Sequence, residues 1–413
     1  MRAAEVKHPA LAPVRVDLSD GLNPDEAAVL AVLLDPQLVA ARSEHDVGRA
    51  QVLDAGILPN PVFGIAVDHP FGSGANGTTN LLDLSLSMST RSLISHGARR
   101  SAAQASLAQI DLGIAWQEWQ VAEQARLLTV RLTWLRRRAE LARKELAFEQ
   151  KTADALAGAS SSGDATLEQV GVQRAALESV RRTVDDLDQS ATNTESDLRV
   201  LLGEPHLEPL QVEAPAPPAG TGAASPGALH ACLAHRLDLQ ALRQGYTAEQ
   251  QRVRQAVLEQ FPDVTVGVHY QRNETALQFI GGFVNFELPL FNRNQGSVAI
   301  GRATRRNLRL EYDARVASTR GDLARLYRLS ALVRRQLPLV RASIPKLEKI
   351  ERKERDAVAS GDIDRLSYQT VRTALFNQRQ QEANLSQALA EAEVGLHTAC
   401  GGRLPASGNR RSP

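Results

Sequence analysis

The sequence predicts a mainly α-helical chain in which one structural unit occurs twice. The unit consists of a helix, two strands, a very long helix, a turn and a further helix. Corresponding motifs lie about 200 residues apart along the 413-residue chain, which is the signature of an internal repeat. The apolar residues, 43% of the total with aromatics at 4%, are mostly Ala, Leu and Val, a mix typical of long packed helices rather than a thick globular core.

Charge and hydropathy limit the function classes. Lys plus Arg number 48 and Asp plus Glu 47, and the net charge of +1 gives no strong attraction to nucleic acid. No run of about 18 apolar residues is present for a membrane-spanning helix. The opening stretch, "MRAAEVKHPALAPVRVDLSDG", has no apolar signal segment, so we expect an upstream in-frame start that encodes one with a cleavage or lipidation site.

Each repeat begins with a capped helix. "NPDEAAVLAVLLDPQLVAAR" begins at Asn23, and "SPGALHACLAHRLDLQALR" begins at Ser225. In both, a capping residue precedes a proline at the first helical position. We predict one helix of about 30 residues in each half, ending at the proline-containing stretches 57–70 and 260–270.

Two alternating segments follow each of these helices, and they predict strands at 61–69, 80–89, 263–271 and 282–291. Their opposite faces carry polar residues, namely Asp68, Asp83, His269, Asn285 and Glu287. A small soluble sheet and a transmembrane barrel both fit this alternation. The uncharged apolar rows favour a barrel wall, with the lipid-facing residues Phe63, Ile65, Val67, Leu84, Leu86, Val266, Val268, Phe286 and Leu288. About eight strands are needed to close a barrel, so several chains would have to share one.

Glycine turns, at Gly97 and Gly296, are predicted to lead from the strands into long helices. The second turn is predicted to contain Asn292, Asn294 and Gly296. A helix over 94–157 would be roughly 95 Å long. Apolar residues recur in it at every seventh position, as in a coiled-coil seam: Leu107, Ile114, Val121, Leu128 and Leu135. In the second half we expect Pro338 and Pro345 to kink or break the equivalent helix.

The motif "SGD" ends both long helical arms, at 162–164 and 360–362. Glycine suits the left-handed position that ends a helix, so Gly163 and Gly361 are predicted helix-tip turns. The predicted organisation is an irregular segment 1–22, a first repeat 23–210, a linker 211–228, a second repeat 229–402 and a disordered tail 403–413.

This arrangement resembles the TolC-like outer-membrane efflux protein family over nearly the whole chain. The resemblance is carried by "DPQLVAAR", "ILPNPVF", "LPLFNRNQGSVAIGRA" and the two "SGD" turns. "LPLFNRNQG" looks most like the heavy-metal-exporting branch, which serves resistance-nodulation-division pumps. The resemblance implies a homotrimer in the outer membrane, with a 12-stranded β-barrel continued by an α-helical tunnel across the periplasm.

The resemblance also implies partners and site residues. The partners are a periplasmic adaptor protein and an inner-membrane resistance-nodulation-division pump. The helix tips Gly163, Asp164, Gly361 and Asp362 would dock the adaptor. The family often narrows its tunnel with carboxylates after the second tip. Here Ser367 and Thr370 occupy those positions, with acids nearby, so the constriction candidates are Asp362, Asp364, Ser367 and Thr370.

No catalytic motif is present in the sequence, and no cofactor or resident metal is expected. The nearly matching strand-end positions of His69 and His269 suggest a metal relay, but solvated histidines are the simpler interpretation. Cys232 and Cys400 are best interpreted as free thiols, with one bridge between them left open. Arginine clusters at 136–138 and 305–306 are interpreted as solvated helix faces. The alternative to an export channel is a soluble coiled-coil scaffold with two small β-hairpins.

Overall fold

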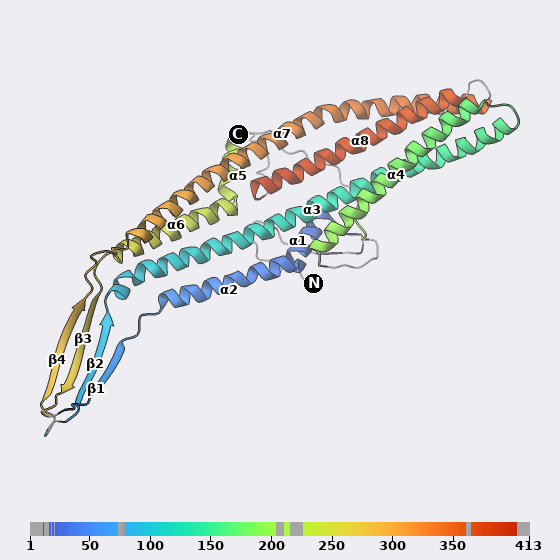
Figure 1. Ribbon diagram of the computed structural model, residues 1–413. Helices are drawn as coiled ribbons and strands as arrows, with labels where there is room; N and C mark the ends of the chain where they lie inside the picture. The colour runs from blue at the N-terminus through green and yellow to red at the C-terminus, as the bar shows by residue number, and fades with distance from the viewer. Residues whose placement is uncertain are drawn as a thin grey trace. The chain divides into compact units, whose positions relative to one another are not determined.

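The computed structural model describes residues 11, 16–17, 19, 21–72, 77, 79–203, 210–214, 226–360 and 365–402. Within these ranges the chain forms helices α1 to α8 and strands β1 to β4 (Figure 1). Their bounds in chain order are α1 (Pro24–Leu34), α2 (Pro36–Gly56), β1 (Val62–Asp68), β2 (Leu81–Ser89), α3 (Arg91–Ser161), α4 (Leu167–Leu201), α5 (Pro226–His235), α6 (Leu237–Leu258), β3 (Val264–Arg272), β4 (Gln278–Phe286), α7 (Gln295–Ser360) and α8 (Arg365–Cys400). A helix pair, a strand pair, a long helix and a shorter helix follow one another twice, so the predicted mainly helical, two-repeat fold is confirmed.

The chain divides into two compact units, and each takes segments from both repeats. Unit 1 consists of Met1–Ala40, Ala115–Arg236 and Ala317–Pro413, and unit 2 consists of Ala41–Ile114 and Leu237–Val316. All the strands therefore belong to unit 2, and the paired ends of the long helices belong to unit 1. In the part of the chain that is described, no helix combines the length and the apolarity needed to cross a membrane.

The predicted single helix at the start of each repeat is wrong, because two shorter helices stand in its place. In the first repeat the side chain of Asn23 caps α1 and accepts a hydrogen bond from the N–H of Glu26 at 2.9 Å. The helix then ends before Pro36, since the residue that precedes a proline disfavours helical geometry. In the second repeat Arg236 lies between α5 and α6, where its guanidinium donates to the carbonyl of Ala399 at 2.7 Å.

The four strands form one antiparallel sheet in the order β1-β2-β3-β4 (Figure 1). β2 pairs with β3, so the strand pairs of the two repeats join within one chain. The first three strands lie within one residue of their predicted bounds. β1 and β4 are the edges of this sheet.

The fourth strand was predicted at 282–291, and this position is wrong. β4 begins four residues earlier and ends at Phe286, which pairs with Val264 at the start of β3. Leu288 therefore lies beyond the strand, although it continues the apolar alternation. One further backbone hydrogen bond runs from the N–H of Glu287 to the carbonyl of Asp263 at 3.0 Å, just before the start of β3. Pro289 has no N–H with which to extend the ladder beyond it.

Both predicted glycine turns are also wrong, because Gly97 and Gly296 lie inside α3 and α7. The turn before α7 is made by asparagines. Asn294 adopts φ +54°, and its N–H donates to the side chain of Asn292 at 3.0 Å. The Asn294 side chain in turn donates to the carbonyl of Ala256 at 2.9 Å. Asparagine tolerates the left-handed conformation and can satisfy its own turn, which explains its presence here.

Helix α3 is longer than predicted, with 71 residues, or about 105 Å at 1.5 Å per residue. The predicted seven-residue row is buried at Ile114, Leu128 and Leu135 and half-buried at Leu107 and Val121. Leu128 and Leu135, the last two residues of that row, are each 6% exposed. Trp134, which directly precedes Leu135, is 9% exposed. The sequence period therefore identified the buried seam of this helix.

Helix α7 runs without a break through Pro338 and Pro345, so the break that we predicted there as one outcome does not occur. Packing explains its continuity. Leu337 belongs to a buried cluster that joins α7 to α8, together with Val333, Leu385 and Leu389. Apolar burial around Pro338 stabilises the helix where that proline removes a hydrogen bond.

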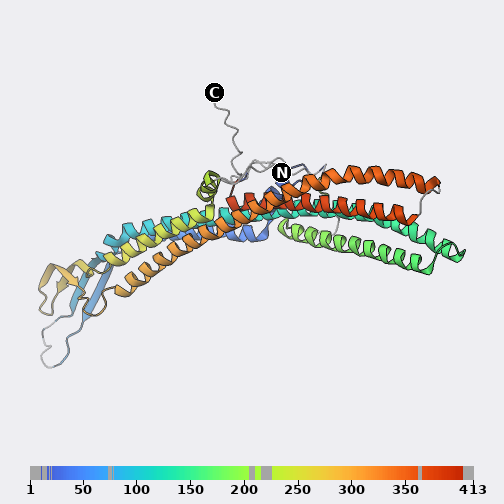
Figure 2. The ribbon, with the colours of Figure 1, turned by 90° about the horizontal axis from the view of Figure 1, so that it is seen from above.

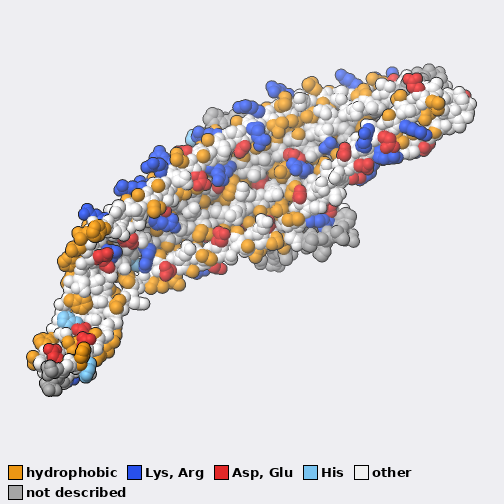
Figure 3. Space-filling model, in the orientation of Figure 1, with side chains coloured by type: hydrophobic (Ala, Val, Ile, Leu, Met, Phe, Trp, Pro, Cys, Tyr) orange, Lys and Arg blue, Asp and Glu red, His pale blue; other side chains and the backbone are white. Residues whose placement is uncertain are grey.

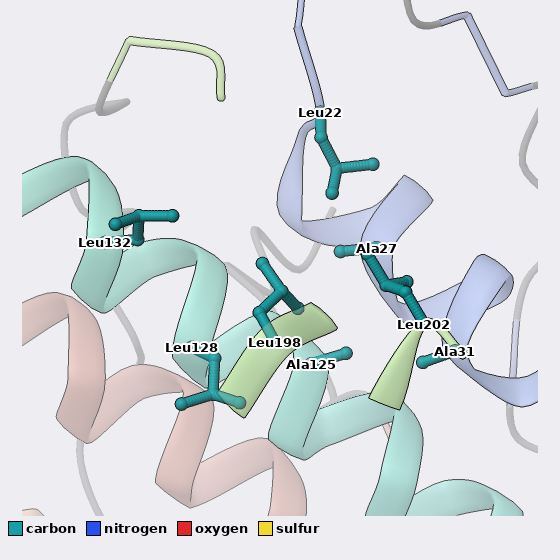
Figure 4. Packing of buried hydrophobic residues seen from close by; sticks show 8 residues of the cluster. All are labelled: Leu22, Ala27, Ala31, Ala125, Leu128, Leu132, Leu198 and Leu202. Atoms are coloured by element: carbon teal, nitrogen blue, oxygen red, sulfur yellow. The ribbon is translucent and has the colours of Figure 1, made fainter. Parts of the chain in front are cut away.

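In unit 1 the end of α3 lies beside α4, and the end of α7 lies beside α8, in both views of the chain (Figures 1 and 2). Clusters of buried side chains hold these helix pairs together. In one of them, Ala142 of α3 and Leu187 of α4 lie in the same buried cluster. Near the start of the chain a further cluster joins α1, α3 and the end of α4 (Figure 4). Its eight residues are Leu22, Ala27, Ala31, Ala125, Leu128, Leu132, Leu198 and Leu202.

A disulfide joins Cys232 of α5 to Cys400 of α8, across 168 residues of sequence. The free-thiol interpretation is therefore wrong, and the bridge that the sequence left open is the one that forms. Both sulfurs lie in a buried cluster with Leu323 and Leu396. Because the helices already pack there, the Cα atoms come within 4.4 Å, which a disulfide can span.

Candidate functional site

One face of the sheet is apolar across all four strands. The register places Phe63 beside Leu86, and Leu86 beside Val268. Phe63 and Ile65 are each 65% exposed, and Phe286 is 61% exposed. Figure 3 shows hydrophobic side chains gathered over the strand region. The apolar residues of this face are Phe63, Ile65, Val67, Leu82, Leu84, Leu86, Met88, Val264, Val266, Val268, Tyr270, Ile280, Val284 and Phe286, and Gly282 lies among them. At one end of the face Leu82 is followed by Arg272 and Gln278, which pair with each other and are not apolar.

This face contains every predicted lipid-facing residue except Leu288, which lies outside the strand. So large an exposed apolar face is unusual for a soluble monomer and marks a surface that contacts lipid or another protein. That the residues of this face contact lipid stays a prediction.

The opposite face is mostly polar. It carries Asp68, Asp83, Ser85, Ser87, Ser89, Thr265, His269, Gln271 and Asn285. Glu287, which we predicted for this face, follows the end of β4. Two aromatic residues interrupt the polar surface, Phe279 and Phe283. Sequence reasoning missed them, although the same alternation that assigns Asn285 to this face also assigns Phe283 to it.

The two histidines suggested for a metal relay have other neighbours. The Nδ1 atom of His69 lies 2.8 Å from the side-chain oxygen of Asn80. His269 lies opposite Ser85 on one side and Gly281 on the other. Among the residues that the structure describes, no group of three or more His, Cys, Asp or Glu side chains could hold a metal ion.

Asp263 ties the strands to the start of α3. Its carboxylate accepts hydrogen bonds from the hydroxyl of Ser89 at 2.6 Å and from the N–H of Arg91 at 3.3 Å. Arg91 also donates to Glu287 at 3.1 Å. The last residue of β2, the first of α3 and the residue after β4 are thus linked to the start of β3. Sequence reasoning missed Asp263, whose only signal is its place after the proline that precedes the strand.

The first predicted helix tip is confirmed as a turn that a glycine makes possible. Gly163 adopts φ +85° two residues after the end of α3. The N–H of Asp164 donates to the carbonyl of Ala159 at 2.8 Å, and the Ser162 hydroxyl donates to the Asp164 carboxylate at 2.9 Å. Thr166 then caps α4. The turn is therefore built by local hydrogen bonds around one left-handed residue.

The second predicted tip, with Gly361, Asp362 and Asp364, lies outside the described residues. Ser367 and Thr370 lie on α8, and both are exposed. Their roles in narrowing a pore, like those of the tips in docking, stay predictions.

Gly163 and Gly158 offer a matched pair of substitutions, since an added Cβ meets nothing within 4 Å at either position. Gly163→Ala should destabilise unit 1 by about 1–2 kcal/mol, because only Gly163 has positive φ. Gly158→Ala lies inside α3 and should stabilise it by about 0.8 kcal/mol. Denaturant unfolding of the two variants measures this difference, and shifts of the same sign would contradict the assigned turn.

A buried acidic cluster joins the two helix pairs of unit 1. Glu149 is 2% exposed, and its carboxylate accepts hydrogen bonds from Gln173 of α4 at 2.5 Å and from Gln369 of α8 at 3.2 Å. Glu145, one turn earlier on α3, lies 3.3 Å from Arg372 of α8. Side chains from both repeats therefore meet in one polar cluster within unit 1.

The same cluster extends to α7. The Tyr368 hydroxyl donates to Glu351 at 2.8 Å, and the Arg372 guanidinium lies 3.7 Å from the centre of the Phe148 ring. One carboxylate oxygen of Glu145 is buried without a hydrogen-bond partner among the described residues. Burial outweighs the neighbouring Arg372 and, with repulsion from Glu149, raises the pKa of Glu145 from 4.5 to about 7.

Stability of unit 1 should therefore depend on pH through Glu145. Its raised pKa means that the folded chain holds the proton more tightly than the unfolded chain. Stability should fall as the pH rises from 4.5 to about 7 and stay level above that. Glu145→Gln mimics the protonated form, so it should stabilise the chain above pH 7 by up to about 3 kcal/mol and change little at pH 4.5.

Unfolding in guanidinium at pH 5 and pH 8, followed by tryptophan fluorescence, tests this expectation. Glu140→Gln is the control, because Glu140 is exposed on the same helix and pairs with Lys144. The assignment is wrong if Glu145→Gln retains the pH dependence of the wild type.

Comparison with solved structures identifies the class of fold. CusC, solved in a study of folding and transmembrane channel formation, matches with a TM-score of 0.72 at 16% identity, over 95% of this chain and 96% of CusC. The outer membrane protein VceC of Vibrio cholerae matches with a TM-score of 0.72 at 18% identity, over 92% and 97% of the two chains. The outer membrane channel CmeC of Campylobacter jejuni matches with a TM-score of 0.74 at 14% identity, over 94% and 88%. The chain has the fold of these outer-membrane proteins.

The sequence itself supports the same class. Residues 228–402 match the family described as outer membrane efflux protein. Comparison with curated protein sequences gives no match. The family match and the shared fold together confirm the resemblance to outer-membrane efflux proteins.

Proposed function

We propose that this protein is the outer-membrane channel of a tripartite efflux system and acts as a passive duct from the periplasm to the exterior. The observation that carries the proposal is the two-faced sheet. Its apolar face is exposed across all strands, and its other face is mostly polar. A β-barrel in a membrane requires this combination, with lipid outside and water inside.

The open edges of the sheet support an oligomer. β1 and β4 each have one side that no strand of the described chain pairs. Unpaired backbone groups are costly in lipid, so the edges must pair with other copies. Three copies would supply twelve strands, the barrel that the family resemblance implies, and β1 of one copy would pair with β4 of the next.

The disulfide supports a location outside the cytoplasm. Cys232 and Cys400 are joined within a buried cluster, and such bonds form in oxidising compartments such as the bacterial periplasm. The helices would then extend from the outer membrane into the periplasm, as in the family.

The helix tips would meet a periplasmic adaptor protein, which links the channel to an inner-membrane resistance-nodulation-division pump. The docking residues we propose are Gly163, Asp164, Gly361 and Asp362. The narrowest part of the tunnel would lie after the second tip, at Asp362, Asp364, Ser367 and Thr370. The cargo would be metal ions or small toxic molecules, and "LPLFNRNQG" in the sequence favours the heavy-metal-exporting branch.

The soluble scaffold with two β-hairpins is the competing function. It is disfavoured because β2 and β3 join the hairpins in one sheet, and because the apolar face of that sheet is exposed. A soluble scaffold would cover such a face.

Fractionation and electrical recording test the proposal. Expressed with a signal sequence, the chain should require detergent for extraction from outer membranes and should form an oligomer. The purified oligomer should conduct ions across a planar lipid bilayer. Extraction without detergent, together with an absence of conductance, would support the scaffold instead.

A further inference from the structure

Two glycines on the polar face of the sheet each lie opposite a ring. Gly267 of β3 pairs with Phe283 of β4, and a Cβ atom added to Gly267 would overlap that ring. His269 of β3 pairs with Gly281 of β4, and a Cβ added to Gly281 would lie 2.9 Å from the imidazole. The glycines leave space that lets both rings lie along the sheet.

The rings form one strip. Phe279, Gly281 and Phe283 share a face of β4, because they are two residues apart. His269 lies opposite Gly281, between the two phenylalanines along the strand direction. The His269 and Phe283 ring centres are 6.1 Å apart, with 38° between the ring planes. We name Phe279, His269 and Phe283 the aromatic strip.

A negative charge lies beside the strip. Asp83 of β2 is opposite Gln271, which is opposite Phe279. Asp83 is also diagonal to His269, a spacing of about 7–8 Å in an antiparallel sheet. Elsewhere the same face carries mainly hydroxyl, amide and acidic side chains, and its other apolar residues, Val62, Ala66 and Leu81, are not aromatic. The strip is therefore a local aromatic surface next to a carboxylate.

Exposing the rings of the aromatic strip to water on a polar face is energetically unfavourable. Serine or threonine, which occupies neighbouring positions, would suffice to line an aqueous lumen. An aromatic face attracts a cation, and a nearby carboxylate adds to that attraction. An aromatic face and a carboxylate together suit a cation that itself carries an aromatic ring.

We propose that the aromatic strip is a solute-contact site in the barrel lumen, and that it recognises aromatic organic cations. The inference rests on the proposed function. Of the two cargoes named there, it favours small toxic organic molecules, whereas the motif "LPLFNRNQG" favours metal ions. With three copies of the chain, the lumen would carry three strips. Phe283 supplies the ring that faces the passing solute, and Asp83 supplies the opposite charge.

Block of ionic current in planar bilayers tests the site. The probe is tetraphenylphosphonium, and tetraethylammonium is the comparison because it has the same charge and no ring. Tetraphenylphosphonium should block the wild-type channel at lower concentration. Phe283→Leu, which retains apolar volume without the ring, should weaken this block by about five- to tenfold, and Phe283→Tyr should preserve it. Asp83→Asn should weaken the block by both cations.

Phe286→Leu is the matched control, since Phe286 lies on the apolar face of the same strand, opposite Val264. It should leave the block unchanged. Equal block of the wild type and Phe283→Leu channels would overturn the aromatic strip while leaving the channel function intact. If the wild-type chain formed no conducting oligomer, the proposed function would fail first, and this site would fail with it.

Discussion

Replacing Val266 with arginine is expected to abolish the membrane-inserted oligomer, whereas the same change at the neighbouring Thr265 is expected to be tolerated. Val266 lies on the apolar face between Met88 and Val284. Thr265 lies on the polar face opposite Asn285. An arginine on the lipid face of a barrel costs about 2–4 kcal/mol near the bilayer midplane, and every copy in the oligomer would incur this cost.

The measurement is the yield of oligomer that resists heat in outer-membrane extracts. Leu84→Arg and Ser85→Arg form a second matched pair on β2, and Phe286→Arg extends the test to β4. Wild-type yields from Leu84→Arg, Val266→Arg and Phe286→Arg would refute the lipid-facing assignment. Equal losses from Thr265→Arg would show that any charge in the sheet is harmful.

Removing the disulfide should produce the second large effect. The bond closes a segment of 168 residues, which restricts the unfolded chain strongly. Changing both Cys232 and Cys400 to alanine should lower the free energy of unfolding by about 2–5 kcal/mol. Alanine is preferred to serine because both positions are buried, and a hydroxyl there would lack a partner.

Guanidinium unfolding with and without a reductant isolates the contribution of the bond. The reductant should shift the midpoint of the wild type toward that of the double alanine variant. It should leave the variant unchanged. If the oxidised wild type and the variant unfolded at the same midpoint, the bond would contribute nothing to stability.

The sequence predicted the strand faces well because alternation in a strand follows directly from backbone geometry. Ile65, Leu84 and Val266 lie on the face expected for them. The buried seam of α3 was predicted for the same reason, since a seven-residue spacing fixes which side of a helix packs. These signals depend only on neighbours along the chain.

The errors arose where distant partners decide the structure. The apolar alternation continues through Leu288, but β4 ends at Phe286 because β3 supplies no further partner. The break expected in α7 does not occur, because buried contacts with α8 hold the helix.

In the candidate site, the outward-facing residues were predictable and the connecting ones were not. Phe63 and Asp83 follow from alternation. The structural roles of Asp263 and Glu145 depend on side chains more than a hundred residues away, such as Ser89 and Arg372. No local pattern contains such pairings.

The interleaving of the repeats has a consequence for how the chain can be divided. Unit 2 takes Ala41–Ile114 from the first half and Leu237–Val316 from the second. A gene cut within the linker 211–228 would give two polypeptides, each with two of the strands and part of both units. Neither fragment could complete the β2–β3 ladder alone, but the two could complement each other when co-expressed. Recombination that exchanged only one half would therefore have to preserve the residues that pair β2 with β3.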